Sequence, residues 1–355
     1  MQLLSKLINP VKSGLVGLDI GSGAVKLLGL RNSSSGWTAT CAAWSDIQPT
    51  EDKTQRYAHT LEAIRACLSA VPAQSARYAV CGLSGPDAAV RGFSFPTMPD
   101  NAMEQAVRFE AQQVCPMDMR HSVLDYQLMQ AVNKVEESAT KQSGILVAGT
   151  EQAIGERCRL VKEAGGKVVL MDADGLAALN CLSELEDLDC CRTAALIDIG
   201  RHFTNVIVLG SNGLPFVRDL NTGGQTLIEE ICGTTGRDAE TVRSALWDAA
   251  EAPLPDDMLS ALYQAARPLI MSITETLKFY STQEKGTFAE KVYLCGGGAT
   301  IRLLTEMLSD ALPTNVSVFD PFKAIRFDTA TTGGDLLKTR GPAFAVAAGL
   351  AIRTV

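Results

Sequence analysis

The sequence predicts an α/β protein made of two copies of one domain, with a smaller α/β subdomain inserted into the first copy. The main observation is that Asp-Ile-Gly occurs twice, at residues 19–21 and 198–200, about half a chain apart. Each copy follows an apolar run and precedes a second β-rich run, a pattern typical of a β-hairpin whose turn carries a carboxylate. A third element, residues 292–308, has the pattern of a strand, a glycine triplet and an amphipathic helix.

Two hairpins of this kind can hold a phosphate chain between their turns. Glycine lets backbone N–H groups approach an anion, and a carboxylate can address a hydrated Mg²⁺. A buried carboxylate is costly unless it is paired or used for a metal. Asp19 and Asp198, each at the end of an apolar strand, are therefore candidate Mg²⁺ residues, and we expect them to lie across one cleft. The glycine triplet indicates a helix N-terminus placed near a ligand.

The composition limits the classes of function. At 355 residues and 46% hydrophobic, the chain can bury a large core and has room for two domains. Its net charge of −8, without a dense Lys/Arg cluster, argues against nucleic acid as a partner. The ten cysteines include no Cys-x-x-Cys pair and are expected to be reduced, mostly core thiols, with Cys190 and Cys191 in a loop. No apolar stretch has the length of a transmembrane helix, so residues 343–352 predict a buried helix and 3–8 a short, partly docked one.

The first copy continues after its hairpin with a strand at 37–44, a helix at 55–68 and a strand at 78–82. Residues 84–152 interrupt this pattern and predict the inserted subdomain. Its expected elements are strands at 88–95, 123–130 and 144–150 and a helix at 101–114. Asp100 is the expected cap of that helix, and Pro116 ends it. A helix ending at 165–166, a strand at 167–171 and a helix at 175–182 complete the copy.

The second copy begins after a polar hinge at 183–191 and repeats the hairpin. Its further expected elements are a strand at 214–221, helices at 224–232, 239–249 and 257–281, the strand, triplet and helix of 292–308, a strand at 316–319 and a last helix.

With this order of elements the chain resembles the superfamily of actin, DnaK-type chaperones and sugar kinases. Within it, the chain is most similar to the type IV pilus assembly protein PilM family, relatives of the division protein FtsA. Beyond the motifs above, the resemblance is carried by residues 93–129, 316–322 and 341–353. It implies an actin-like (ribonuclease H-like) fold of duplicated βββαβα domains. The implied parts are a tail at 1–13, a first actin-like domain (subdomain 1A) at 14–83 and 153–190, an inserted SHS2 subdomain (1C) at 84–152, a second actin-like domain at 191–340 and a C-terminal helix at 341–355 that returns to the first domain.

The resemblance also implies ATP and Mg²⁺ as cofactors, with Asp19 and Asp198 holding the metal through water. The other implied residues are Gly21, Ser22 and Gly23 at the β- and γ-phosphates, Gly200 and Arg201 in the second turn, Gly223 and Gly224 behind the phosphates or ribose, and Gly296, Gly297 and Gly298 at the adenosine. The alternative for each glycine group is a tight turn that needs positive φ, and for residues 333–334 we expect only that.

Two departures from the family pattern predict weak or absent ATPase activity. The second turn continues with Arg201, His202 and Phe203 instead of small residues, although Arg201 could pair with a phosphate. In the long helix, the positions that resemble a Glu and Arg clamp on ribose and base hold Ser272 and Glu275, and a carboxylate cannot replace that cation. Lys278 could substitute from the next turn, or it could simply face solvent.

The resemblance therefore favours a scaffold over an enzyme. In the family the partner is the cytoplasmic N-terminal peptide of the inner-membrane protein PilN, held as an extended peptide between the first subdomain and the inserted one. The candidate residues here are Phe109, Val114, Pro116 and Tyr126, which could instead belong to the core. Such a protein is expected in the cytoplasm, at the inner membrane only through its partners; whether it forms homo-oligomers is left open. The alternative is an active ATPase or small-molecule kinase of the same superfamily.

Overall fold

The computed structural model describes residues 15–72, 78–129, 141–188, 193–210, 213–248, 253–283, 287–328 and 330–353. The helix expected at residues 3–8 and the pair Cys190 and Cys191 lie outside these ranges. The chain forms two compact units, one from residues 1–83, 152–187 and 320–355 and the other from residues 84–151 and 188–319.

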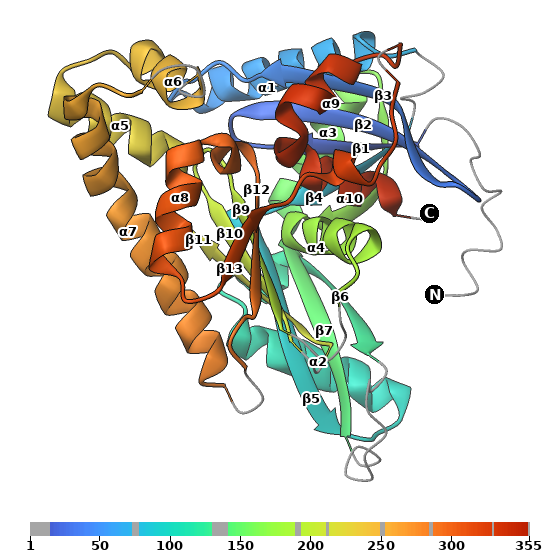
Figure 1. Cartoon of the computed structure of the whole chain (residues 1–355). Coiled ribbons are helices and arrows are strands. Elements are labelled where there is room, and N and C mark those ends of the chain that lie inside the picture. Colours follow the sequence, from blue (N-terminus) through green and yellow to red (C-terminus); the bar gives the residue numbers. More distant parts are fainter. Residues whose placement is uncertain are drawn as a thin grey trace. The chain divides into compact units, whose positions relative to one another are not determined.

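The first unit contains a five-stranded sheet in the order β3-β2-β1-β4-β8 (Figure 1). The strands are β1 (Leu15–Ile20), β2 (Ala24–Ser33), β3 (Gly36–Asp46), β4 (Tyr78–Leu83) and β8 (Lys167–Ala173). β1, β2 and β3 are antiparallel, whereas β4 and β8 run parallel to β1. The first Asp-Ile-Gly segment therefore forms the β1–β2 hairpin that the sequence predicts.

Alternation along these strands gives the sheet two apolar faces. Val16 and Leu18 of β1 share one core with α1 (Lys53–Ser69) and α3 (Glu151–Glu163), because residues two apart in a strand point to the same side. α1 begins at Asp52, whose carboxylate accepts a hydrogen bond from the Gln55 N–H at 2.8 Å. The opposite face is covered by α4 (Asp174–Leu185) and α10 (Ala345–Ile352), and α9 (Gly334–Arg340) packs beside β3.

α10 approaches the sheet so closely that side chains are excluded at the contact. A Cβ on Gly17 would overlap the carbonyl oxygen of Ala347 and lie 2.6 Å from the backbone nitrogen of Ala351. A Cβ on Gly349 would likewise overlap the backbone of Ala177 in α4. The Ala- and Gly-rich sequence of α10 permits these approaches, and the helix is almost fully buried, as predicted for residues 343–352.

The second unit contains a sheet with the same topology, in the order β11-β10-β9-β12-β13. Its strands are β9 (Ala194–Ile199), β10 (Thr204–Leu209), β11 (Pro215–Leu220), β12 (Lys291–Cys295) and β13 (Asn315–Val318). Its helices are α5 (Gly224–Thr235), α6 (Ala239–Asp248), α7 (Asp256–Ser281) and α8 (Arg302–Ala311). β9, β10 and β11 are antiparallel, and β12 and β13 run parallel to β9, so the duplication extends to strand direction.

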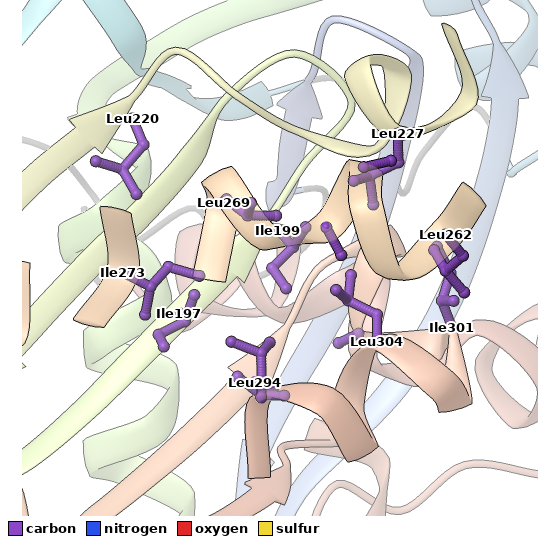
Figure 2. Close-up of a cluster of buried hydrophobic side chains, with 14 of the residues drawn as sticks. Ile197, Ile199, Leu220, Leu227, Leu262, Leu269, Ile273, Leu294, Ile301 and Leu304 are labelled. Atoms are coloured by element: carbon purple, nitrogen blue, oxygen red, sulfur yellow. The ribbon is translucent and has the colours of Figure 1, made fainter. Parts of the chain in front are cut away.

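One face of this sheet forms the core drawn in Figure 2. Ile197 and Ile199 of β9 and Leu294 of β12 meet side chains from α7, such as Leu269 and Ile273. These residues are spaced by two along the strands and by four along the helix, so each element presents a single apolar face. The opposite face of β9 carries Asp198, which leaves this carboxylate outside the apolar core.

The inserted subdomain packs a three-stranded sheet, in the order β5-β7-β6, against one helix. Its elements are β5 (Ala88–Pro96), α2 (Asp100–Val114), β6 (Ser122–Met129) and β7 (Lys141–Thr150). Met103 and Val107 of α2 pack on Phe93 and Leu146 of the sheet. The predicted cap is wrong by one residue: Pro99 is the N-cap, and Asp100 is the first helical residue, because proline presets the extended backbone there.

Two further details differ from the pattern predicted for the glycine triplet and the C-terminal part. The triplet does not open α8 directly: a short 3₁₀ turn at Gly297–Thr300 follows Gly296, and α8 begins only at Arg302. The chain from Asp320 onward lies in the first unit, where backbone bonds from Ala39 to Arg326 and from Ala42 to Thr332 cover the edge of β3.

Candidate functional site

The first turn combines a buried carboxylate with a cation that the sequence analysis did not single out. Asp19, at the end of β1, is 4% exposed, and Lys26 of β2 donates to it with Nζ 2.7 Å from Oδ2. The two residues are direct cross-strand partners. A lysine inside the otherwise apolar strand AVKLLGL is the signal that could have identified Lys26, because a charge in a buried strand needs a partner.

The residues of the first turn are small and accessible. Gly21 donates its N–H to the Ala24 carbonyl at 3.1 Å, which closes the turn, and Ser22 is exposed. A Cβ on Gly21 would lie 3.7 Å from Asp19 Oδ1 and 3.9 Å from Lys26 Nζ, so both members of the ion pair lie beside the turn that Gly21, Ser22 and Gly23 form. The glycines leave the backbone accessible beside this pair.

Aromatic and cationic side chains extend this arrangement along the same face of the sheet. Lys26 Nζ lies 5.5 Å from the ring centroid of Trp44, its cross-strand partner on β3. Arg340 of α9 stacks on Trp44 with its guanidinium carbon 4.7 Å from the ring. Trp44 is thus contacted by two cations, Lys26 and Arg340, and its indole N–H donates to the Asp46 carboxylate at 3.0 Å.

The second turn is bonded to the start of α5. Gly200 donates to the Phe203 carbonyl at 3.0 Å and accepts from the Gly224 N–H at 2.9 Å, while Arg201 accepts from the Gln225 N–H at 2.8 Å. The first amides of α5 are therefore used by the turn and are not directed at a ligand. Arg201 Nε also donates to the side chain of Gln225 at 3.2 Å, which holds the guanidinium toward α5.

Gly223 allows close packing of the second turn, whereas a Cβ on Gly224 would make ordinary contacts at 3.7 Å. A Cβ on Gly223 would lie 2.6 Å from the Arg201 carbonyl oxygen and 2.7 Å from that of Gly200. Glycine is therefore required by the contact between turn and helix. The reason differs from the positive φ that the turn alternative predicted, because Gly223 has φ −154° and Gly224 is also absent from the glycines with positive φ.

The glycine triplet lies beside Asp198. Gly296 has φ +84°, and a Cβ there would overlap an oxygen of the Asp198 carboxylate, while a Cβ on Gly298 would overlap Ile199. Gly297 meets nothing within 4 Å of a built Cβ, so open space adjoins it. The indole N–H of Trp247 donates to the Gly297 carbonyl at 3.2 Å and holds the triplet in place. Asp198, the second turn and the triplet thus form one site within the second unit.

Lys278 is not part of this site. It is exposed in the last turn of α7, next to Phe279, whose ring lies 6.2 Å from that of Phe216. Phe216 pairs with Val208, which in turn pairs with Ala195 at the start of β9. Asp198 is at the other end of that strand, about 10 Å further on. The structure therefore does not bring Lys278 to the glycines.

A polar row crosses the second sheet through Asp198. Asp198 pairs with Asn205 of β10, and Asn205 pairs with Asp219 of β11. Asn205 is 5% exposed, and its Oδ1 has no hydrogen-bond partner in the part of the chain that the structure describes. Burial raises the pKa of Asp219 to about 6, with a contribution from Asp198, although Arg91 and the Gly85 N–H act in the opposite direction. Asn205 and Asp219 were not predicted, although their spacing from the second turn in β10 and β11 is the signal for such a row.

No group of three or more His, Cys, Asp or Glu side chains suited to a metal occurs in the described residues. Any Mg²⁺ at Asp19 or Asp198 would then depend mainly on water and phosphate oxygens, which is the usual preference of this ion. Within the second unit, open space adjoins Gly297, whereas the first amides of α5 are bonded to the second turn.

The candidate partner residues of the inserted subdomain fall into two groups. Phe109 is 63% exposed on α2, and Pro116 is also exposed. Val114 and Tyr126 are half-buried against the core of the subdomain, and the Tyr126 ring contacts Phe93 edge-on at 6.2 Å. Phe109 is thus a surface residue, and Tyr126 contributes to both core and surface.

Comparison with known proteins gives consistent results over nearly the whole chain. A family model described as type IV pilus assembly protein PilM matches residues 17–355. A chain in the structure of a PilM-PilN type IV pilus biogenesis complex has a TM-score of 0.80 and 26% identity, covering 96% of this chain and 98% of that one.

More distant similarities concern the fold alone. The ethanolamine utilization protein EutJ from Carboxydothermus hydrogenoformans has a TM-score of 0.56 and 16% identity, covering 98% of this chain and 93% of that one. A glycerol dehydratase reactivase has a TM-score of 0.51 and 10% identity, covering 95% and 98%. The predicted actin-like ATPase fold with duplicated mixed sheets is confirmed.

Proposed function

The chain belongs to the type IV pilus assembly protein PilM family, and on that premise we propose that it is a scaffold of the pilus inner-membrane complex. In this proposal it captures the cytoplasmic N-terminal peptide of a PilN-like membrane protein. The observation that carries the proposal is the match, over 96% of the chain, to a chain in a PilM-PilN complex. The matched length includes the inserted subdomain, which the proposal makes the peptide-binding part.

The surface of the inserted subdomain supports peptide capture. Phe109, Val123 and Leu128 are exposed apolar side chains, at 63%, 51% and 37%. β6, like β5, is an edge strand of its three-stranded sheet, and an extended peptide can add to such an edge. Residues 84–151 contain nine Asp or Glu and five Lys or Arg. Cytoplasmic segments next to membrane helices are rich in Lys and Arg, so the charges are complementary.

Peptide capture would bring this chain to the membrane through its partner. In the described residues, no helix has both the length and the apolar character needed to cross a bilayer. A cytoplasmic protein held at the inner membrane by a peptide contact is consistent with that finding. Homo-oligomers would be compatible with this role.

Nucleotide binding is a secondary part of the proposed function. Asp19 and Asp198 would hold Mg²⁺ through water, Gly21, Ser22 and Gly23 with Lys26 would contact phosphates, and the 296–298 triplet would contact adenosine. ATP would regulate partner affinity, and hydrolysis would be weak or absent. Asp19→Ala should abolish nucleotide binding, because it removes the metal's anchor and leaves Lys26 without its partner; calorimetry with Mg²⁺ and ATP measures this.

The alternative is an active ATPase or small-molecule kinase, and the intact first turn with Lys26 beside Asp19 is the observation that favours it. Steady-state ATP turnover by the purified chain distinguishes the two. Brisk turnover that Lys26→Met abolishes would favour the enzyme, whereas turnover near the uncatalysed rate supports the scaffold.

The main test combines affinity with thermal stability. Phe109→Ala should weaken binding of a synthetic peptide of the PilN-like N-terminal tail by about 1–3 kcal/mol with little change in Tm, because the ring is exposed. Tyr126→Ala should lower both, because its ring also packs on Phe93. Phe288→Ala is the matched control, since Phe288 is 73% exposed outside the subdomain. Unchanged affinity in both subdomain variants, with both folded, would contradict the proposal.

A further inference from the structure

The second turn contacts the inserted subdomain through Phe203. Its ring lies against Gly85, the first residue of the 3₁₀ turn Gly85–Asp87 that opens the subdomain; a Cβ on Gly85 would be 3.4 Å from two ring atoms. Gly85 has φ +70°, a conformation that favours glycine. The bulky residue that departs from the family pattern of small residues is therefore used in a contact between the turn and the subdomain.

Asp219 makes a second contact at the same place. The Gly85 N–H and the Arg91 guanidinium of β5 both favour the ionised carboxylate of Asp219 and act to lower its pKa, so both groups lie near it. Arg91 is itself held by two backbone carbonyls: Nε donates to Val114 at 3.2 Å and Nη1 donates to Val90 at 2.8 Å. The guanidinium thus connects the end of α2 with the second sheet.

The other end of the row is Asp198, which in the proposed function would hold Mg²⁺ through water. Asn205 lies between Asp219 and Asp198, and its buried Oδ1 has no hydrogen-bond partner in the described residues. A buried acceptor without a donor raises the free energy of the state that contains it. A metal-bound water at Asp198 would supply that donor, so ligand binding at Asp198 is expected to rearrange the row that ends at Asp219 and Gly85.

We propose that Phe203, Gly85, Asp219 and Arg91 form a joint through which a nucleotide polyphosphate at the second turn sets the position of the inserted subdomain and so changes its affinity for the partner peptide. This inference rests on the proposed function, because it concerns the regulation of the same peptide site. Coupling of this kind is reciprocal, so the peptide must change the affinity for nucleotide by the same factor. Couplings in proteins commonly amount to about 5- to 150-fold.

In the full chain, the test measures the coupling factor, which is the ratio of the affinities for the synthetic tail peptide with and without nucleotide. Affinity for the synthetic tail peptide is measured with and without Mg²⁺ and ATPγS, and hydrogen–deuterium exchange is followed in the same samples. In the wild type we expect a change of about fivefold or more in peptide affinity. We also expect nucleotide to alter exchange at residues 85–96, and peptide to alter exchange at residues 200–204.

Phe203→Ala and Asp219→Asn should reduce the factor toward one, and Phe203→Leu should restore part of it because it keeps an apolar contact with Gly85. Phe216→Ala is the control: it lies on the same strand as Asp219 but packs on Phe279 and Tyr280, so it should lower stability and leave the factor unchanged. If Phe203→Ala does not fold, the coupling factors of Phe203→Leu and Asp219→Asn still test the joint.

The outcomes separate the two proposals. A wild type that does not bind the peptide contradicts the proposed function, and the nucleotide-dependent exchange at residues 85–96 then still decides the joint. Peptide binding without nucleotide dependence, or a factor that Phe203→Ala and Asp219→Asn leave unchanged, overturns the joint. The joint is also overturned if, in the wild type, nucleotide does not alter exchange at residues 85–96 and peptide does not alter exchange at residues 200–204.

Discussion

The two Asp-Ile-Gly turns follow the same strand topology but differ in the size of their residues and in what those residues contact. In the first, Asp19 is buried and paired with Lys26 beside small, accessible residues. In the second, the residues after Gly200 are large, and Phe203 packs on Gly85 of the inserted subdomain. The first turn therefore presents small residues beside an ion pair, whereas the second turn also packs against the inserted subdomain.

The difference teaches that a departure from a binding motif can have a packing cause. Arg201 and Phe203 look like obstacles to a phosphate when only the local sequence is considered. In the structure Arg201 is held toward Gln225, and Phe203 fits against a glycine from a distant part of the chain. Phe203, one of the residues that depart from the motif, thus contacts the neighbouring subdomain, and Arg201 contacts α5.

The largest expected effect is on the strand of the first turn. Gly17→Ala should destabilise by about 3 kcal/mol or more, because its Cβ would overlap Ala347 of α10. The matched position in β9 is Leu196, 1% exposed, where loss of the side chain in Leu196→Ala should cost about 2–5 kcal/mol. Gly155→Ala, exposed in α3 with no neighbour within 4 Å, should be neutral or stabilising by up to about 1 kcal/mol. Urea unfolding measures all three, and wild-type stability in Gly17→Ala would refute the close approach of α10.

The next prediction compares the loss of stability when the cation of each turn, Lys26 or Arg201, is replaced. Lys26→Met should cost about 2–3 kcal/mol, because it leaves the buried Asp19 carboxylate without its ammonium partner. Adding Asp19→Asn should recover part of this loss. Arg201→Met should cost less than about 1 kcal/mol, because the side chain is half-buried and its guanidinium donates to the neutral amide of Gln225 at 3.2 Å and not to a buried carboxylate. Denaturant melts of the three variants and the wild type give the values, and equal losses for Lys26→Met and Arg201→Met would remove the contrast between the turns.

A smaller, pH-dependent effect is expected at Asp219. Its pKa is raised from 3.8 to about 6 by burial, so the folded state binds the proton more tightly, and this group's contribution to stability falls as the pH rises from about 4 to 6. Two pKa units correspond to at most about 3 kcal/mol, and partial exposure to solvent reduces this. Asp219→Asn should therefore be about 1–2 kcal/mol more stable than the wild type at pH 7 and equal to it near pH 4. A difference that does not change with pH would show that the carboxylate is not buried at the contact with Gly85.

The smallest effect is expected at Lys278. The residue is exposed and lies at the end of the sheet away from Asp198. Lys278→Ala should change stability by less than about 0.5 kcal/mol and leave nucleotide affinity as it is. A clear loss of nucleotide affinity in this variant would show that Lys278 belongs to the nucleotide site.

Much of the fold follows from local patterns. The apolar runs around Asp19 and Asp198, the helical spacing in α1 and the Ala-rich last helix predicted their elements within a few residues, because these patterns depend on neighbours close in sequence. The predicted element bounds were wrong where residues far away in the sequence constrain the backbone conformation. Gly296 takes φ +84° because its neighbours are Asp198 and Ile199, so the triplet ends in a 3₁₀ turn before α8 begins.

By itself the sequence determined the duplicated hairpins, the place of the insertion, the two carboxylates and the family resemblance, all of which are properties of strand and helix periodicity or of short motifs. Only the tertiary structure decided what the carboxylates and glycines contact. The pairing of Lys26 with Asp19 could have been inferred from the hairpin register, but the contacts of Gly85 with Phe203 and Asp219 could not. These contacts join segments far apart in the chain, and such pairs form because the packing of whole elements brings them together, not because of any preference in the residues nearby.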